Sequence, residues 1–279
     1  MELSKKKQLS VTALNVRRGI VDSIHAAKAG HPGGSLSIAD LLTYLYFDKM
    51  NIDPKNPKKA DRDRLVLSKG HAAPALYSVL AHRGFFPVEE LLTLRKTGSR
   101  LQGHPDMKHI PGVDMSSGSL GQGISCAVGM ALSAKHFGDT YRVYTILGDG
   151  ECEEGQVWEA AMFAGNKGLS NLTVFVDFNG LQIDGSVEEV NSPAPLDKKF
   201  EAFGFKVVVI DGHNFDEIEN AVAVAEKTSD KPTAIIMKTT KGKGVSFMEN
   251  KCGWHGKAPG DEDYANAVAE LDAALAELA

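Results

Sequence analysis

Hydrophobic residues recur at two different spacings along the chain, and segments of the two kinds alternate. Val11, Leu14, Ile20 and Ile24 lie on one face of a helix that should end near Gly30. Later amphipathic segments predict further helices over residues 37–47 (with Ser37 as a cap), 72–82, 88–96, 123–136, 154–164, 196–203, 215–227 and 261–278. Short apolar or β-branched runs predict strands over residues 64–67, 141–147, 172–176, 206–210 and 233–237.

Strands that alternate with helices predict an α/β fold with a mostly parallel sheet flanked by helices. Continuous apolar strands suit a sheet that is buried on both faces. No linker rich in Pro, Gly and Ser divides the sequence, so we expect one domain over residues 1–279. In the last helix, Ala265, Val268, Leu271 and Leu275 predict an apolar face that covers this domain or a partner.

Composition narrows the class of protein. The chain is 43% hydrophobic and 24% charged with a net charge of −5, which is typical of a globular protein and not of a nucleic-acid binder. No stretch has the length of a membrane span or the form of a signal peptide, so we expect no membrane partner. The 3 cysteines show no Cys-x-x-Cys spacing, which favours a reducing, cytoplasmic location.

Four of the predicted strands end in polar or glycine-rich sequence. If these strands are parallel, their carboxyl ends share one edge of the sheet, where open α/β sheets bind ligands. The segments after the four strands are Gly148-Asp149-Gly150, then Asp177, Asn179 and Gly180, then Asp211-Gly212-His213-Asn214, and finally Lys241-Gly242-Lys243-Gly244.

The first two of these segments offer ligands for a hard cation. Asp149 and Asn179 supply side-chain oxygens, which suit magnesium, or calcium or manganese, better than zinc. Backbone amides at the start of the helix near Glu154 could hold a phosphate, and Lys241 adds a positive charge. The residues therefore predict a metal-bridged diphosphate site, with two unrelated turns as the alternative.

Gly148-Asp149-Gly150 followed by Asp177-Phe178-Asn179 resembles the fingerprint of the thiamine diphosphate enzymes. The resemblance implies the three-layer thiamine diphosphate-binding fold. It also implies that Asp149, Asn179 and the backbone carbonyl of Leu181 bind a divalent metal.

Further segments are similar to those of transketolases, in the same order and over nearly the whole chain. They are Ala29-Gly30-His31-Pro32-Gly33-Gly34, Ser68-Lys69-Gly70-His71-Ala72, Gly103-His104-Pro105-Asp106, Gly118-Ser119-Leu120-Gly121-Gln122-Gly123 and Trp254-His255-Gly256-Lys257. This resemblance implies the transfer of a two-carbon ketol unit from a ketose, or its phosphate, to an aldose.

The transketolase resemblance also implies roles for individual residues. His31 and His255 would handle protons of donor and acceptor, His104 would hold a hydroxyl, and His71 would lie near the cofactor diphosphate. Glu154 would relay protons between two active sites across an interface between two copies of the chain. The implied cofactor-binding residues are His71, Gly118, Ser119, Leu120, Gly150, Asn179, Lys241 and His255.

Several polar residues keep an open or ordinary interpretation. The roles of Lys69, Lys257, Glu159 and His213 stay open, although His213 follows a strand end. The remaining histidines are expected to be surface or core residues without a catalytic role, namely His25, His82, His109 and His136.

Full-length transketolases carry further domains, which supply an activating glutamate, an aromatic cradle for the cofactor ring and arginines for the sugar phosphate. The resemblance of this chain covers only the first domain. We therefore expect a separate C-terminal subunit to complete the enzyme as a heterotetramer, with the pentose phosphate pathway as the default setting. Two alternatives remain open: the α-subunit of a 2-oxo acid dehydrogenase or related enzyme, and a non-catalytic assembly subunit. The donor sugar, and whether it must be phosphorylated, cannot be deduced from the sequence.

Overall fold

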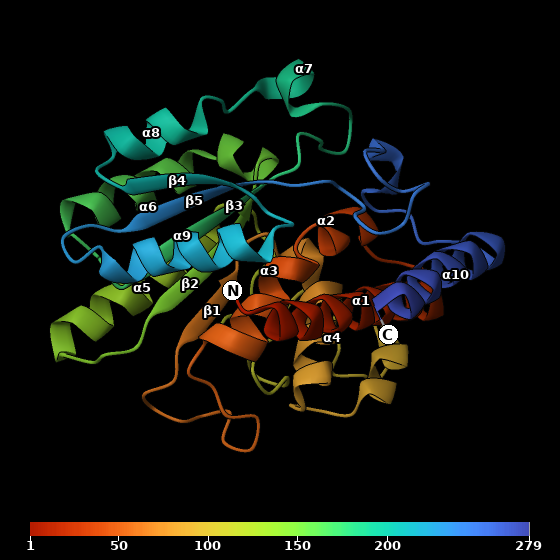
Figure 1. The fold of residues 1–279 in the computed structure, drawn as a ribbon. Coiled ribbons are helices and arrows are strands. Elements are labelled where there is room, and N and C mark those ends of the chain that lie inside the picture. Colours follow the sequence, from red (N-terminus) through yellow and green to blue (C-terminus); the bar gives the residue numbers. More distant parts are fainter. Residues whose placement is uncertain (279) are drawn as a thin grey trace.

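A parallel five-stranded sheet forms the centre of the computed structural model, which describes residues 1–278 (Figure 1). The strands follow the order β1-β2-β3-β5-β4, and every neighbouring pair is parallel. Their bounds are β1 Arg64–Leu67, β2 Val143–Gly148, β3 Leu172–Phe178, β4 Lys206–Asp211 and β5 Thr233–Lys238. All five predicted strands and the parallel pairing are confirmed.

Helices cover both faces of this sheet and give a three-layer α/β architecture (Figure 1). One face packs against α1 (Leu3–Ala27), α3 (Ala39–Tyr44), α4 (Ala73–Arg83) and α9 (Phe215–Lys227). The other packs against α5 (Gln122–Phe137), α6 (Gly155–Asn166) and α8 (Leu196–Ala202). Successive strand residues alternate between the two cores, as the pleat requires: Leu65 and Leu67 face the first core, and Val66 the second.

Shorter helical segments and a long last helix complete the fold. They are α2 (Pro32–Leu36), η1 (Leu45–Lys49), η2 (Gly70–Ala72), η3 (Val88–Thr93), η4 (Gly150–Glu153), α7 (Val187–Asn191), η5 (Cys252–Trp254) and α10 (Asp261–Leu278). The helix predicted over residues 88–96 is therefore only the short 3₁₀ helix η3.

The helix predicted over residues 37–47 was wrong in its start and in its cap. The segment contains α3 and the π-helical turn η1, and Ser37 ends α2 instead of capping a helix. The Ser37 hydroxyl donates to Asp177 Oδ2 over 2.7 Å. A buried carboxylate needs hydrogen-bond donors, and this need turns Ser37 toward the sheet edge.

The last helix covers this domain, because α10 packs along α1 (Figure 1). Leu271 is fully buried, and the rings of Tyr264 and His25 stack with centroids 4.0 Å apart. Ala267 is also buried, whereas Ala265 is exposed, so the predicted apolar face was wrong at that residue.

The strand register brings the polar segments together at one edge of the sheet. Gly148 pairs with Asp177, Asp177 pairs with Met237, and Lys238 pairs with Asp211. The prediction that the four strand ends share one edge is confirmed, and this edge is where the candidate site lies.

Within residues 1–278, no helix combines the length and the apolar character that crossing a bilayer requires. Cys126, Cys152 and Cys252 are free thiols.

Leu271→Ala should lower the free energy of unfolding by about 2–5 kcal/mol, because it removes a buried side chain between α10 and the body of the domain. Urea denaturation followed by circular dichroism measures the change. Leu275→Ala is the matched control, since Leu275 is only partly buried in the same helix and should cost less. Equal losses in both variants would contradict this account of α10.

Candidate active site

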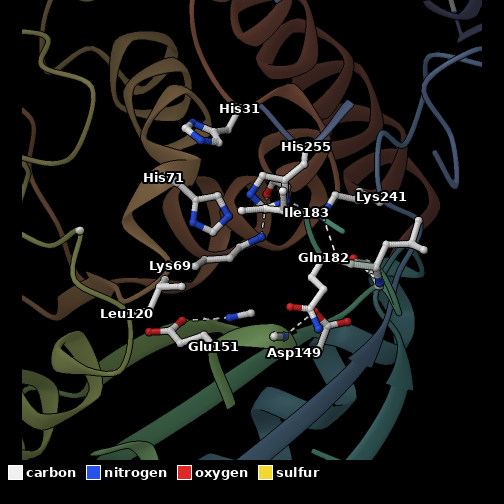
Figure 2. Close-up of a pocket in the computed structure, with 16 residues that line it drawn as sticks. His31, Lys69, His71, Leu120, Asp149, Glu151, Gln182, Ile183, Lys241 and His255 are labelled. Carbon is white, nitrogen blue, oxygen red and sulfur yellow. Dashed lines mark hydrogen bonds between the residues drawn. The ribbon is translucent and has the colours of Figure 1, made fainter. Parts of the chain in front are cut away.

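A cavity of about 260 Å³ opens at the carboxyl edge of the sheet. Figure 2 shows His31, His71 and His255 on its helix side, and Asp149 and Glu151 on its strand side. Two lysines also line it, Lys69 and Lys241. The cavity thus combines carboxylates, imidazoles and ammonium groups in one small volume.

Asp149 follows β2 and is a buried carboxylate, with only 3% of its surface exposed. It accepts hydrogen bonds from the backbone N–H groups of Gly150 at 2.8 Å and Gly180 at 2.6 Å. Among the described residues it forms no salt bridge. Burial and the nearby negative charge of Asp177 raise its pKa to about 6. A bound cation would stabilise the ionised carboxylate, so Asp149 is suited to be a metal ligand.

Asn179 and Leu181 lie in the turn that follows β3, next to Asp149. The Leu181 N–H donates to Asn179 Oδ1 over 3.1 Å, and both residues line the cavity. In the part of the chain described, no group of three or more His, Cys, Asp or Glu side chains is placed to hold a metal. A cation here would therefore depend on one carboxylate, one amide oxygen, one carbonyl and oxygens of the ligand, a set that suits magnesium.

Lys69 is paired with Asp177, and both side chains are almost completely buried. The Lys69 ammonium donates to Asp177 Oδ2 and to the Gly34 carbonyl, each over 2.6 Å. Burial alone would raise the pKa of Asp177, but the charge of Lys69 and several hydrogen bonds lower it. The other donors to Asp177 are the side chains of Ser37, Thr239 and Asn179.

Lys241 carries the second ammonium group of the cavity. Its Nζ donates to the Leu181 carbonyl over 2.9 Å and lies 3.0 Å from His255 Nδ1. Burial and the charge of Lys69 lower the pKa of Lys241 to about 8. An anion in the cavity would favour the charged form of this lysine.

Three histidines form a compact cluster, with ring centroids 5.1–5.5 Å apart. Burial is the largest cause that lowers their pKa values, followed by nearby positive charges: Arg95 for His31, Lys69 for His71 and Lys241 for His255. The pKa falls to about 4 for His31 and about 3 for His255, and that of His71 falls well below its usual value.

These imidazoles are therefore neutral near pH 7, and each ring keeps one unprotonated nitrogen that can accept a hydrogen bond. Lys241 donates to His255 Nδ1, so the proton of neutral His255 is on Nε2. His31 Nδ1 is buried and has no hydrogen-bond partner within residues 1–278.

The glycine-rich loop before α5 is held by Glu151, a residue that the sequence analysis missed. Its carboxylate accepts from the Ser68 hydroxyl and from the N–H groups of Gly121 at 2.9 Å and Gly148 at 3.0 Å. Gly121 has φ +81°, and an added Cβ would lie 3.0 Å from that of Glu154. Glu151 and Gly121 thereby fix the loop against β2.

The structure brings most of the predicted site residues into this cavity and leaves three outside its lining. Lining it are His31, His71, Gly118, Leu120, Asp149, Gly150, Asn179, Leu181, Lys241 and His255. His104 packs beside it, since a Cβ added to Gly118 would lie 3.1 Å from the His104 ring. Ser119 is exposed in a neighbouring groove, and Glu154 is exposed at the start of α6.

Other lining residues were missed or left open by the sequence analysis: Gly34, Lys69, Gly148, Glu151, Gln182 and Ile183. Gly34, Gly148 and Glu151 are within or next to the motifs already noted, so their positions gave a usable signal. Gln182 and Ile183 follow Leu181 directly, but nothing in their residue types indicates a ligand site.

Lys69→Met should destabilise the protein by about 3–5 kcal/mol, because it leaves the buried carboxylate of Asp177 without its cation. Urea denaturation measures the loss. Lys198→Met is the control, since Lys198 pairs with Glu201 on the surface and should change stability little. A loss no larger than that of the control would contradict the importance of the buried pair.

Acidification from pH 7 to pH 5 should destabilise the protein through these histidines. Unfolded imidazoles bind protons below about pH 6.5, whereas His31 and His255 resist protonation until about pH 4 and 3 in the folded state. The unfolded state then binds more protons, and stability falls as the pH falls.

Urea midpoints at both pH values test this expectation. His31→Gln and His255→Gln should each reduce the fall between pH 7 and pH 5. His136→Gln, which changes an exposed histidine, should leave the fall unchanged. An identical pH dependence in all variants would show that the clustered imidazoles are not its cause.

Comparison with known proteins places the chain in a family. The family model described as the transketolase thiamine diphosphate binding domain matches residues 8–274. The chain is 51% identical to the 6-deoxy-6-sulfo-D-fructose transketolase subunit of Clostridium sp. (strain MSTE9), with 92% of this chain and 94% of the relative covered. It is 42% identical to an apulose-4-phosphate transketolase subunit of Phocaeicola vulgatus, with 94% and 93% covered.

Solved structures agree with this placement. Transketolase from Leishmania mexicana matches with a TM-score of 0.91 and 32% identity, over 95% of this chain and 41% of that one. The chain thus spans less than half the length of that solved transketolase. Relatives named as transketolases or their subunits do not favour the two alternatives, a non-catalytic protein and a 2-oxo acid dehydrogenase. The chain therefore belongs to the transketolase family, and residues 8–274 match that family's thiamine diphosphate-binding domain.

Proposed function

We propose that this chain is the diphosphate-binding subunit of a two-chain transketolase, which moves a two-carbon ketol unit from a ketose to an aldose. One observation carries the proposal. Asp149 and Asn179, at adjacent strand ends, line the same small cavity as a cluster of three neutral histidines.

Asp149, Asn179 and the Leu181 carbonyl would hold a divalent metal, most suitably magnesium, whose charge would offset that of the cofactor diphosphate. Lys241 would place its ammonium group at the same diphosphate. The remaining cofactor contacts would come from His71, Gly118, Ser119, Leu120, Gly150 and His255. Thiamine diphosphate, when bound, supplies a ring that accepts the electron pair released on cleavage of the sugar.

The histidines would manage the protons of the sugar hydroxyl and carbonyl groups. Burial and neighbouring charges keep the imidazoles of His31 and His255 neutral near pH 7, so each ring has an unprotonated nitrogen that can accept a hydrogen bond from a sugar hydroxyl. His31 and His255, which line the cavity, would contact hydroxyls of donor and acceptor. His71 would lie near the reacting centre, and His104, beside Gly118, would hold a hydroxyl of the transferred unit.

A C-terminal subunit would complete the site. Two relatives of similar length support this expectation, because their names call them transketolase subunits. Two copies of this chain would also meet across the active-site interface. Together with two C-terminal subunits they would form a heterotetramer. Exposed apolar residues on α6 support such an interface, with Met162 56% and Phe163 40% exposed. Glu154 and Glu159 are close to them in sequence, and Glu154, which is exposed, would relay protons between the two sites.

The names of two relatives suggest a substrate class for this enzyme. They refer to 6-deoxy-6-sulfo-D-fructose and apulose-4-phosphate, which are sugars with a terminal anion. We accordingly favour a ketose with a terminal sulfonate or phosphate, pentose phosphates included, as the donor in a cytoplasmic pathway. Sulfonated, phosphorylated and unmodified ketoses, assayed side by side, would identify the preferred terminal group.

Activity should require the assembled enzyme, thiamine diphosphate and a divalent metal. The chain is assayed for ketose–aldose exchange alone and after co-expression with a C-terminal subunit of a split transketolase. Asp149→Asn should weaken metal-dependent cofactor binding by about 100-fold or more, because it removes a charged ligand. Calorimetric titration with thiamine diphosphate and magnesium measures the change.

Asp184→Asn is the matched control, since Asp184 is exposed three residues beyond Leu181 and should leave binding unchanged. Full activity of the chain alone would contradict the two-chain enzyme. Unchanged cofactor affinity in Asp149→Asn would contradict the metal site. Decarboxylation of 2-oxo acids without ketol transfer would contradict the proposed reaction.

A further inference from the structure

A charged cluster lies outside the cavity, at the point where α1, α3 and the end of β4 meet. The guanidinium of Arg17 binds the carboxylate of Asp40 in a bidentate pair, with distances of 2.9 and 2.6 Å. His213 Nδ1 lies 2.8 Å from Asp40 Oδ2. Arg17 and Asp40 are buried and the side chain of His213 is only 15% exposed. The hydrogen bonds among these three largely buried side chains therefore hold His213 in one orientation.

Two hydrogen bonds lead from this cluster to the segment that carries Lys241. The backbone N–H of Thr240 donates to His213 Nε2 over 2.9 Å, immediately before the lysine. Arg17 Nε donates to the carbonyl of Lys243 over 3.0 Å, two residues after it. Asp40 therefore binds both Arg17 and His213, and these two side chains hydrogen-bond to the backbone on either side of Lys241.

The hydrogen bonds determine the tautomer of His213. A backbone N–H can only donate, so His213 Nε2 accepts and the proton of the neutral ring is on Nδ1, where it donates to Asp40. Burial would raise the pKa of Asp40, but the charge of Arg17 and the bond from His213 hold it well below its usual value. Asp40 therefore stays ionised and keeps the ring in this orientation.

We infer that His213, oriented by Asp40 and Arg17, is a positioning residue that fixes the Lys241 ammonium at the diphosphate end of the cavity. The inference rests on the proposed role of Lys241 toward the cofactor. A lysine on a restrained backbone loses less conformational entropy when it binds an anion than one on an unrestrained segment. Supporting groups of this kind typically change ligand affinity by about 10-fold to 100-fold when removed.

His213→Phe tests the inference by keeping the size of the ring and removing its hydrogen bonds. Thiamine diphosphate with magnesium is titrated calorimetrically into the enzyme assembled with its C-terminal subunit. We expect affinity to fall by about 10-fold. His213→Gln should restore most of it, since one amide can accept from the Thr240 N–H and donate to Asp40.

A double variant distinguishes positioning from a general structural effect. If His213 acts through Lys241, His213→Phe should cause no further loss of affinity in a Lys241→Met background. An equal loss in both backgrounds would overturn the inference. His82→Phe is the matched control, a partly buried histidine on α4 that should leave cofactor affinity unchanged even if it lowers stability.

Hydrogen exchange gives a readout that needs no cofactor. In the assembled enzyme, His213→Phe should speed exchange of the amides in residues 239–244, and His213→Gln should not. Unchanged exchange in His213→Phe would overturn the inference by itself. Failure of the unmodified enzyme to bind thiamine diphosphate would instead contradict the proposed function, while the exchange result would still decide the role of His213.

Discussion

The buried ion pair between Asp177 and Lys69 connects the elements on which the cavity depends. Asp177 is at the end of β3, and its carboxylate receives donors from the α2 region, from the segment before η2 and from the end of β5. An ionised carboxylate inside a protein is stable only when several donors and a cation surround it. This requirement holds four segments, distant in sequence, at fixed positions around the strand ends.

The same pair determines the electrostatics of its surroundings. The negative charge of Asp177 helps to raise the pKa of Asp149, and the positive charge of Lys69 helps to lower the pKa values of His71 and Lys241. The cavity therefore combines neutral imidazoles with a carboxylate whose pKa is raised and a lysine whose pKa is lowered. A cation bound together with a diphosphate would stabilise the charged forms of both the carboxylate and the lysine.

A second network of buried polar side chains lies outside the cavity and supports the segment that carries Lys241. Asp40 links Arg17 and His213, whose hydrogen bonds reach the backbone on both sides of Lys241. The side chains at the cavity surface thus depend on buried polar groups that no ligand would contact. Such support determines how closely a site is preorganised, because a charged side chain on an unrestrained loop loses much of its effect.

The sequence by itself determined the alternation of strands and helices, the parallel sheet and the family, because these depend on local periodicity and on motifs such as Gly148-Asp149-Gly150. It also indicated most of the lining residues, since strand ends in a parallel sheet share one edge. Only the tertiary structure decided that Ser37, Lys69 and Glu151 serve buried hydrogen bonds, and that His213 faces Asp40. These contacts join residues 30 or more positions apart in sequence, up to 173 for His213 and Asp40, and local pattern contains no information about which distant partner satisfies a buried polar group.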